Sequence, residues 1–439
     1  MSATEHQNAW YQSACHVRTS LWGKTSEPLS ELEVLQQKVR ADVAVVGAGF
    51  CGLSSALHLA KKGVNVVVVD AHEPGWGASG RNGGQVIPGL KIFPDEMVRR
   101  FGSDPGEQIA RTVGAAPQLV FDLIEQHAID CDLRKTGWIQ LAKGPQGRKT
   151  TDAHVEQWGR LGAPVSGLDK SEIEMKVGTD AYLSGLLDKR GGTLHPLKYA
   201  RGLARACLSM GVKVYRDSPA ISVERDPQCW TVKTMEGSVE AEKVVVCTNG
   251  YTGNMLPGLS DSVVPVLTGV VATDPLTDNL KNKILPGRQG AADTRRLLSW
   301  FGIDRDDRLI FGSRINTQKE LIDPQNFSFG VSRLHEIFPE VADTPLQHMW
   351  TGRVALTLDH VPHIHKLAEG LYSGLGFNGR GVAMATMFGK VLAGHCTDQP
   401  DVESFLPVTP VPKVPLSRFR SQGITIALTW KRLMDTLQP

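Results

Sequence analysis

Three glycines in the spacing GxGxxG have the clearest chemical use in this sequence: Gly47, Gly49 and Gly52. They follow Ala41–Val46, a valine-rich apolar run that is typical of a strand buried on both faces. The first glycine of such a turn permits a tight bend, the second lets the backbone approach a phosphate, and the third lets the next helix pack closely. Phe50 and Cys51 lie within the turn, next to the start of the helix, where backbone N–H groups and the positive dipole end attract anions. The spacing therefore predicts a phosphate-binding turn.

The residues that follow complete a βαβ unit. Apolar residues recur at helical spacing over 53–62, and the second strand, Asn65–Val69, ends in Asp70, eighteen residues after Gly52. A carboxylate at this place can accept hydrogen bonds from the ribose hydroxyls of a dinucleotide. We therefore expect Asp70 and the adjacent Ala71 to contact the adenosine half of a bound dinucleotide.

A second glycine-rich stretch begins a few residues later. Five glycines lie in the ten residues from Gly75 to Gly84, which would be a costly composition for an ordinary solvent loop. A loop that approaches a bulky ligand explains them better, with Arg81 near a phosphate and with Ser79 and Asn82 bonding ring or ribitol groups. The residues expected to contact the ligand are Ala78, Ser79, Arg81, Asn82, Gly83, Gly84 and Gln85.

A third glycine cluster, over 374–381, leads into a predicted helix over 382–392. Such a junction can direct backbone donors at a polarised group, which suits the negative charge that develops on a flavin ring during reduction. NAD-dependent dehydrogenases do not generally return to their cofactor near the C-terminus, so the sequence favours FAD, with an NAD-linked enzyme as the weaker alternative. The contacts expected here are Gly376, Asn378, Gly379, Arg380, Gly381 and Val382.

Together these motifs resemble the FAD-dependent D-amino acid oxidase-like (DAO) superfamily over nearly the whole chain. The stretch GWGASGRNGGQ at 75–85 is similar to bacterial gamma-glutamylputrescine oxidases. The stretches LLDKRGGTLHPLKYA at 186–200 and GFNGRG at 376–381 are similar to those enzymes and to bacterial L-pipecolate oxidases. The resemblance implies an α/β fold, in which a discontinuous Rossmann-like FAD-binding domain lies beside an α+β substrate domain with a mixed sheet.

The resemblance also implies how the chain divides. The FAD-binding domain would comprise residues 1–89, 186–262 and 350–439, and the substrate domain residues 90–185 and 263–349. Within the first, we expect a helix over 196–210 and strands over 212–216, 221–234 and 239–246. The family's adenosine contacts would then fall on Ala220, Thr248, Asn249 and Gly250.

Two arginines are expected to position the substrate. The segment 350–362 matches the superfamily's WAGLRPLTPDGLP-like motif without gaps, and the arginine of that motif clamps the substrate carboxylate in amino-acid-oxidising members. The matching position here is Val354, whereas Arg353 stands one residue earlier and would point to the opposite face of a strand. This departure favours an amine, or a substrate whose carboxylate is remote or held by another group. Arg380 is the second candidate, since it stands where the family often has a histidine; for Arg353, a surface or interdomain ion pair is the alternative.

Two further departures concern the flavin. Sarcosine oxidases of this superfamily carry a flavin-adjacent lysine at the position that matches Ile310, so activation of O2 would lack that positive charge here. Those enzymes also tether the flavin through a cysteine near the 350 segment, whereas no cysteine lies between Cys247 and Cys396. We therefore expect noncovalent FAD that is reoxidised by O2 or by another acceptor.

Composition argues against several other classes of protein. Lys and Arg number 48 against 46 Asp and Glu, so the charges nearly balance and no nucleic-acid partner is expected. The seven cysteines are scattered, so neither a metal site nor a disulfide framework is expected. No apolar run reaches the ~18 residues of a transmembrane helix, and no signal peptide is evident, so a cytoplasmic location is expected. The amphipathic segment 423–437 is expected to pack on the protein itself, with peripheral membrane contact as the alternative.

The function predicted from these motifs is FAD-dependent oxidation of the C–N bond of a small amine or secondary amino acid to an imine, by hydride transfer to flavin N5. O2 is the expected acceptor, and its reduction gives H2O2. Two alternatives stay open: a dehydrogenase that passes electrons to a quinone or another acceptor, and a noncatalytic flavoprotein.

Overall fold

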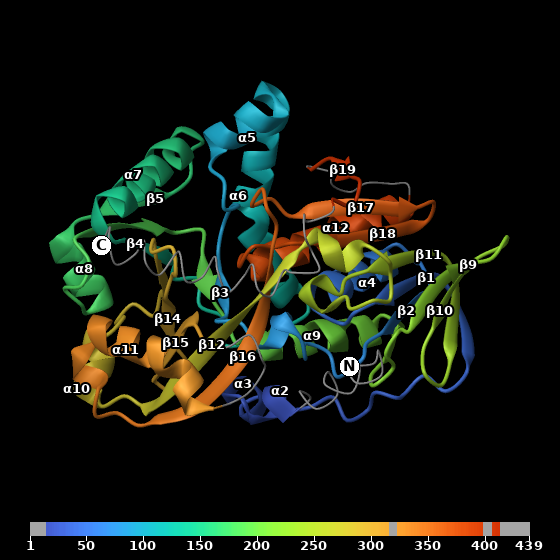
Figure 1. Cartoon of the computed structure of the whole chain (residues 1–439), viewed down its shortest axis with the longest axis horizontal. Helices are drawn as coiled ribbons and strands as arrows, with labels where there is room; N and C mark the ends of the chain where they lie inside the picture. Colours follow the sequence, from blue (N-terminus) through green and yellow to red (C-terminus); the bar gives the residue numbers. More distant parts are fainter. Residues whose placement is uncertain (1–14, 316–322, 398–405, 413–439) are drawn as a thin grey trace.

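The computed structural model describes residues 15–315, 323–397 and 406–412, so the amphipathic segment 423–437 lies outside the described residues. The described chain forms two large sheets that lie side by side, with helices packed against them (Figure 1). One sheet is largely parallel and the other is mixed. This arrangement confirms the α/β fold class with a second, mixed sheet.

The nine-stranded sheet combines strands that are far apart in the sequence. Its order is β19-β17-β18-β11-β1-β2-β8, and β10 and β9 extend it beyond β11. The strands that pair in parallel at its centre are β1 (Lys38–Val46), β2 (Val66–Val69), β8 (Lys213–Tyr215), β11 (Ser238–Val246) and β18 (Leu371–Leu375). The others are β9 (Ser222–Arg225), β10 (Trp230–Lys233), β17 (His363–Ala368) and β19 (Val408–Thr409).

Both faces of this sheet are covered. Val43 and Val45 face a core that includes the helices α4 (Phe50–Lys61), α6 (Ser103–Gln126), α9 (Pro196–Ser209) and α12 (Gly381–Thr397). Ala44 and Val46 face a second core, on the side of β10 and β11. Burial on both faces explains why these strands read as continuous apolar runs rather than as alternating patterns.

The eight-stranded sheet has the order β16-β12-β15-β14-β13-β4-β6-β5. Its strands are β4 (Trp138–Ala142), β5 (Val165–Leu168), β6 (Ser184–Asp188), β12 (Val264–Pro275), β13 (Gly290–Asp293), β14 (Trp300–Ile303), β15 (Arg308–Arg314) and β16 (Leu346–Leu356). All neighbours pair antiparallel except β13 and β4. The helices beside it are α7 (Gly144–Arg160), α8 (Lys170–Val177), α10 (Asp278–Lys283) and α11 (Ser328–Ile337), whereas α5 (Pro94–Phe101) packs mainly on α6.

Two limits expected for the domains, at residues 186 and 350, fall inside β6 and β16. Both strands pair only with members of the eight-stranded sheet among the described residues. The division into domains stays a prediction, and membership of the sheets would move residues 186–188 and 350–356 to the substrate side.

The strand expected over 221–234 was wrong in one respect, because it is two strands, β9 and β10. The Asp226 carboxylate accepts hydrogen bonds from the backbone of Gln228 and Cys229, at 2.8 and 2.9 Å, and so closes a turn between them. Pro227 cannot donate to a sheet, which makes this sequence a natural break. The helix expected over 53–62 begins three residues earlier, at Phe50.

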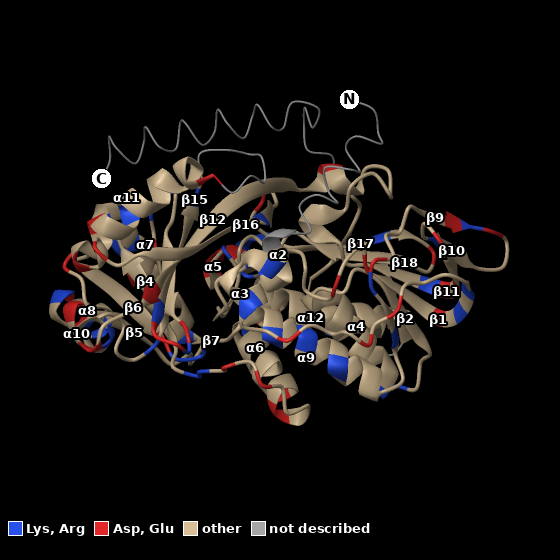
Figure 2. Cartoon of the chain, turned by 90° about the horizontal axis from the view of Figure 1, so that it is seen from below, with Lys and Arg blue, Asp and Glu red and all other residues tan. Residues whose placement is uncertain are grey.

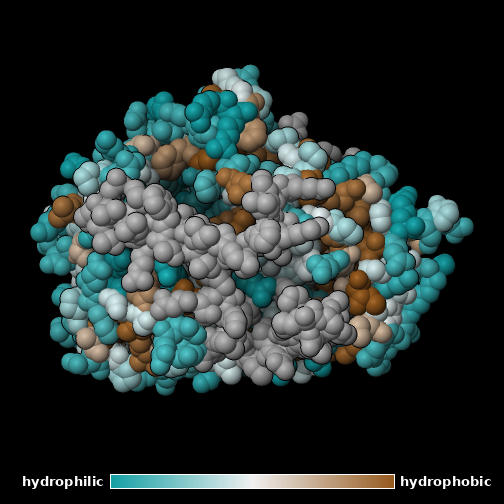
Figure 3. All heavy atoms as spheres, in the orientation of Figure 1, coloured by the Kyte–Doolittle hydropathy of each residue, from teal (hydrophilic) through white to brown (hydrophobic). Residues whose placement is uncertain are grey.

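The surface mixes charges and hydropathy. Lys and Arg are interspersed with Asp and Glu over the elements seen in Figure 2. On the face shown in Figure 3, hydrophobic residues form small patches between hydrophilic ones. Within the described ranges, no helix is both long enough and apolar enough to span a bilayer.

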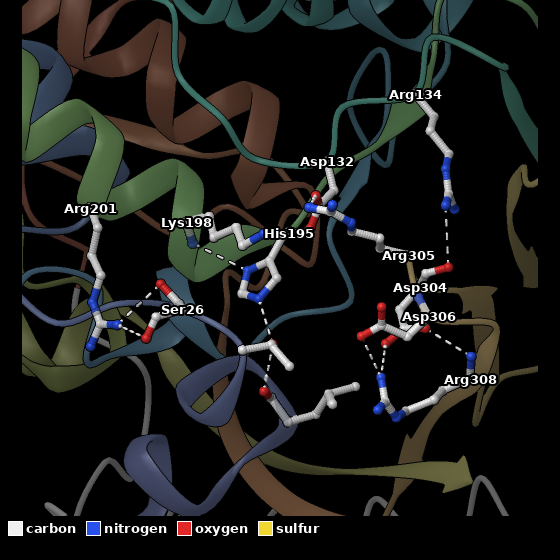
Figure 4. Close-up of polar contacts among 12 residues, drawn as sticks. Ser26, Asp132, Arg134, His195, Lys198, Arg201, Asp304, Arg305, Asp306 and Arg308 are labelled. Atoms are coloured by element: carbon white, nitrogen blue, oxygen red, sulfur yellow. Dashed lines mark hydrogen bonds and ion pairs between the residues drawn. The ribbon is translucent and has the colours of Figure 1, made fainter. Parts of the chain in front are cut away.

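His195 ties the N-terminal helices to α9. Its Nδ1 accepts a hydrogen bond from the backbone of Lys198 at 3.2 Å and so caps α9, while its Nε2 lies 2.9 Å from the hydroxyl of Thr25 at the end of α3 (Leu21–Lys24) (Figure 4). Nearby, Asp132 lies 3.0 Å from the Lys198 ammonium and 3.4 Å from the Arg305 guanidinium. Burial lowers the pKa of His195 to about 3, so this side chain is neutral at neutral pH.

Replacing His195 with alanine should lower the free energy of unfolding by about 1 kcal/mol near pH 7, the usual value of a lost helix cap. The gap should narrow as the pH falls from about 6.5 towards 3, because the unfolded wild-type chain binds a proton that folded His195 excludes. Urea unfolding of both proteins at pH 7 and pH 5 measures the gap. His195→Asn, which can still cap the helix, is the control, and a gap that widens at pH 5 would contradict the argument.

Candidate functional site

The turn between β1 and α4 lies at the carboxyl end of the parallel strands. Gly47 has a φ of +105°, and a Cβ there would lie 3.0 Å from the carbonyl oxygen of Cys247, at the end of β11. A Cβ on Gly52 would lie 1.9 Å from the carbonyl oxygen of Gly47. Only glycine fits these two positions without moving the backbone, so the turn is held directly against the ends of two strands.

The first amides of α4 face this turn. Gly49 is the N-cap and supplies no side chain, while the Phe50 N–H donates to the hydroxyl of Ser79 at 3.0 Å. The N–H groups of Cys51 and Gly52 have no acceptor one turn earlier in the helix. Together with the helix dipole, they form a place for an anionic oxygen.

Asp70 completes the turn from the neighbouring strand. Its carboxylate accepts hydrogen bonds from the backbone N–H of Ala48 at 2.6 Å and of His72 at 2.9 Å. Burial raises the pKa of Asp70 to about 6, the two amides offset part of that rise, and the charge of nearby Asp217 adds to it. Ala71 follows directly, and the carbonyl of Asp70 accepts from the Ser218 backbone at 2.7 Å.

The ends of β8 and β11 bring in the remaining adenosine-side candidates. Ala220 lies after β8 and packs against the core beneath β10. Thr248 leads into a short 3-10 helix, η2 (Asn249–Tyr251), and the carboxamide oxygen of Asn249 accepts from the Gly376 N–H at 2.9 Å. The sequence therefore identified two loops that meet here, although they are 127 residues apart.

Cys51 and Cys247 lie under the same turn as a pair of thiols. Their sulfurs are 3.4 Å apart and both residues are buried. The hydrogen bond between the two thiols, together with burial, raises the pKa of Cys51 well above its ordinary value. Cys51 is therefore a neutral thiol packed beneath the turn.

The loop over 75–85 folds largely on itself and on other parts of the protein. The Asn82 carboxamide donates to the carbonyls of Ala78 and Ser79, at 3.0 and 2.9 Å, and accepts from the Gly84 N–H at 2.8 Å. Arg81 is buried, with its Nε 2.7 Å from the Trp76 carbonyl and its guanidinium 4.2 Å above the Trp76 ring. The side chains of Arg81 and Asn82 thus shape the loop.

The glycines of this loop are mostly explained by packing. A Cβ on Gly83 would lie 2.2 Å from the Trp300 ring, and one on Gly84 would lie 1.9 Å from the Leu194 carbonyl oxygen. A Cβ on Gly75 would lie 2.7 Å from the side chain of Ala200. The sequence predicted that a ligand approaches this loop closely, whereas at Gly75, Gly83 and Gly84 the group that approaches is protein.

Gln85 joins this loop to the second sheet. Its amide nitrogen donates to the carbonyls of Ala291 and Phe301, both at 3.0 Å, and its oxygen accepts from the Trp138 indole at 2.9 Å. The side chain is buried and all three bonds go to the eight-stranded sheet. Gln85 was predicted as a cofactor contact; its carboxamide fixes the loop on the sheet.

The third glycine cluster forms a rigid turn before α12. The Asn378 carboxamide accepts from the Thr357 N–H at 2.9 Å and donates to the carbonyl of Gly376 at 2.7 Å. Gly379 has a φ of +83°, a Cβ there would meet nothing within 4 Å, and Gly381 begins the helix. Val382 is buried in the core behind it. The exposed backbone of this junction is therefore free to face a ligand.

The register of β16 places Arg353 and Val354 on opposite faces. A Cβ on Gly352, which shares a face with Val354, would lie 3.3 Å from the Cβ of Arg81. Arg353 points the other way, and its guanidinium lies 5.3 Å from the centre of the Tyr251 ring. An arginine at 353 therefore does not take the place of one at 354.

Arg380 extends from the start of α12 towards the eight-stranded sheet. Its Nη1 donates to the Pro88 carbonyl, and its guanidinium lies 5.3 Å from the centre of the Trp138 ring on β4. Burial lowers the pKa of Arg380 to about 10, which leaves it charged at neutral pH. Of the two candidate arginines, Arg380 is buried and Arg353 is half-buried.

Sequence reasoning missed the polar group beside Arg380. Asp188 on β6 is fully buried, and the Arg190 guanidinium binds it through two hydrogen bonds, at 2.9 and 2.6 Å. Burial alone would raise the pKa of Asp188, but these bonds outweigh it and hold the pKa at about 2. His154 on α7 lies 3.6 Å from the same carboxylate. Asp188 and Arg190 lie within the stretch 186–200 that carries the family resemblance, but nothing in that stretch assigned them a role at the site.

The surroundings of the site include Ile310, the position matched to the lysine of sarcosine oxidases. Ile310 is buried in an apolar cluster with Val270, Ala272 and Trp350. Across the described ranges, no three His, Cys, Asp or Glu side chains are grouped so that they could hold a metal ion.

Comparisons with known proteins agree with this geometry. The family model described as DAO, FAD dependent oxidoreductase, matches residues 42–394. The chain is 31% identical over 387 residues to a probable oxidoreductase OrdL of Haemophilus influenzae, covering 86% of this chain and 88% of the relative. It is 30% identical over 393 residues to the gamma-glutamylputrescine oxidoreductase of Escherichia coli, covering 89% of each.

Solved structures show the same fold. The glycine oxidase of Geobacillus kaustophilus superposes with a TM-score of 0.70 at 22% identity, over 86% of this chain and 99% of the other. An L-proline dehydrogenase of P. horikoshii superposes with a TM-score of 0.68 at 19% identity, over 84% and 97% of the two chains. At these identities the match speaks for the fold.

Replacing Gln85 with methionine, which keeps the length of the side chain, should lower the stability by about 2–5 kcal/mol, because it leaves three buried groups without a partner. Urea unfolding followed by tryptophan fluorescence measures the change. Gln118→Met on the exposed face of α6 is the matched control and should leave the midpoint nearly unchanged. Equal midpoints for the two variants would contradict the assigned role of Gln85.

Replacing Asp70 with asparagine should weaken FAD binding at pH 7 and remove its pH dependence. Ribose hydroxyls donate to the ionised carboxylate, so the wild-type Kd should rise as the pH falls below about 6, the pKa of Asp70, approaching tenfold per unit. Quenching of FAD fluorescence by apoprotein between pH 5 and 7.5 measures this.

Asp217→Asn is the control for that experiment, because it keeps the Asp70 carboxylate and removes a charge that raises its pKa. Its pH dependence should persist and shift to lower pH. A slope of Kd against pH in Asp70→Asn equal to that of the wild type would contradict the role assigned to the Asp70 carboxylate.

Proposed function

The chain belongs to the DAO family of FAD-dependent oxidoreductases, and from that premise we propose that it oxidises the C–N bond of a small amine or secondary amino acid to an imine. Gamma-glutamylputrescine and pipecolate represent the two kinds of substrate. The observation that carries the proposal is the apolar Val354 at the position of the family's carboxylate clamp, with no arginine on that face of β16. A substrate oxidised here needs no carboxylate next to the reacting carbon, which suits an amine.

The residues at the turn fit FAD. The Gly47 turn and the first amides of α4 suit a pyrophosphate, and the Asp70 carboxylate suits ribose hydroxyls. At the other end, the open backbone around Gly379 and Gly381 suits the pyrimidine edge of a flavin. When bound, FAD supplies the acceptor for the two electrons and the hydrogen that leave the C–N bond.

The chain's own residues would hold the substrate in a fixed position. The loop over 81–85 lies across the eight-stranded sheet, held by Gln85 at β13 and β14 and by Trp350, whose indole donates to the Arg81 carbonyl at 3.0 Å. Such a fixed loop can keep the reacting carbon at one distance from the acceptor, which supplies much of the rate of this type of reaction. No side chain is proposed as a general base.

We propose O2 as the electron acceptor, giving H2O2, with a quinone or another acceptor as the alternative. Ile310 supports the alternative, because an apolar residue stands at the position matched to the flavin-adjacent lysine of sarcosine oxidases, whose charge would stabilise superoxide. Arg380 supports the oxidase, since it is a buried cation beside the α12 junction.

Anaerobic mixing of the FAD-loaded protein with gamma-glutamylputrescine, putrescine, pipecolate, proline and sarcosine tests the proposal. At least one amine should bleach the oxidised-flavin absorbance, and the product should be an aldehyde or a cyclic imine. Failure of every amine to bleach the flavin would favour a noncatalytic flavoprotein. Admission of air then distinguishes the acceptors, because slow return of the oxidised spectrum contradicts the oxidase.

A further inference from the structure

Arg380 is a buried cation whose hydrogen-bonding capacity is mostly unused. The residue is 6% exposed, and its guanidinium makes one hydrogen bond, to the Pro88 carbonyl. Its other N–H groups have no acceptor, and no carboxylate lies within ion-pair distance, among the residues of the described ranges. Buried charges in proteins are normally paired, so this arrangement calls for a counter-ion that the protein does not supply.

The neighbouring carboxylate, that of Asp188, is already paired with Arg190. The Asp188 carboxylate accepts from the Arg190 guanidinium at 2.9 and 2.6 Å and from the Arg190 backbone at 3.1 Å. His154 beside it is neutral, because burial lowers the pKa of its ring. The group of Asp188, Arg190 and Arg380 therefore carries one positive charge in excess, in an interior position where solvent screens it poorly.

The position of Arg380 directs that charge to the junction of the two sheets. It stands between Gly379 and Gly381 at the start of α12, a helix of 17 residues whose N-terminal dipole adds to the positive potential. The guanidinium lies over Trp138 on β4, and the Trp138 indole is bonded to Gln85 at the end of the glycine loop. The cation is thus bordered by both loops that form the candidate flavin site.

We propose that Arg380 binds a carboxylate group of the substrate, in place of the clamp that Val354 cannot provide. The inference rests on the proposed function and narrows it: the substrate is an amine that carries a carboxylate. A guanidinium with free donors suits a carboxylate because two parallel N–H···O bonds can form. Such a ligand would neutralise the excess charge and satisfy the unused donors together.

Binding of an unreactive carboxylate to the resting, oxidised FAD enzyme tests the proposal without turnover. The probes are 2-furoate and its uncharged amide, 2-furamide, titrated against the flavin absorbance spectrum. The wild type should bind 2-furoate at least roughly tenfold more tightly than the amide, as expected for a charge-assisted hydrogen bond. Arg380→Gln should raise the Kd of 2-furoate by roughly 10- to 100-fold and leave that of 2-furamide unchanged.

Arg380→Lys is the second variant, because it keeps the charge and the fold but cannot form two parallel N–H···O bonds. Its Kd for 2-furoate should lie between those of the wild type and Arg380→Gln. Arg305→Gln is the matched control, since it removes an exposed arginine that lies 3.4 Å from Asp132, and it should bind 2-furoate like the wild type. If Arg380→Gln does not retain FAD, the wild type and Arg380→Lys still decide the question.

Three results would overturn the proposal: a wild type with no preference for 2-furoate over the amide, an Arg380→Gln variant with the wild-type Kd, or an Arg380→Lys variant with the wild-type Kd. In the second case, a flavin reduction potential lowered in Arg380→Gln would assign the cation to the reduced flavin instead. Failure of the proposed function looks different, because then no amine bleaches the flavin while Arg380-dependent binding of 2-furoate persists.

Discussion

A hydrogen bond between the Asp70 carboxylate and the Ala48 amide, 2.6 Å long, holds the candidate site together. It links the end of β2 to the turn that leaves β1, and the carbonyl of Cys247 presses against that turn from β11. Because parallel strands end at one edge of a sheet, these contacts concentrate backbone donors at a single point. The carboxylate is costly to bury, as its raised pKa shows, and a ligand that donates to it would recover part of that cost.

The loop over 81–85 is one of several contacts that join the two sheets. Residues 81–85 leave the dinucleotide turn and cross to the eight-stranded sheet, where Gln85 and the Trp350 indole fix both ends of the crossing. A cofactor seated on the first sheet would therefore be aligned with the second without a dedicated hinge. The loop is rigid because its polar groups are satisfied by protein, as the three bonds of Asn82 illustrate.

Elements formed by neighbouring residues could be predicted from the sequence, whereas contacts between residues far apart in the sequence could not. The unit β1-α4-β2 follows from valine runs, glycine spacing and a terminal acid, all within about thirty residues. The glycines over 75–84 were expected to let a bulky ligand approach, but the groups that approach Gly75, Gly83 and Gly84 are Ala200, the Trp300 ring and Leu194, each more than one hundred residues away. Asp188 lies in the stretch 186–200 that carries the family resemblance, but its position beside Arg380 depends on contacts that form only when the strands have assembled.

Burial distinguishes the two arginines that the sequence nominated. Arg353 is half-buried on the face of β16 opposite Val354, lying over Tyr251, and solvent moderates the cost of its charge there. Arg380 is 6% exposed and has less of this relief, so its charge is costly for folding unless a counter-ion pairs with it. Because Arg380 lowers stability and stands where the loops over 75–85 and 374–381 meet, a role in binding a ligand explains it better than a role in holding the fold together. The same logic accounts for Val354, since a site that places its cation on α12 has no need of a second one on the adjacent strand.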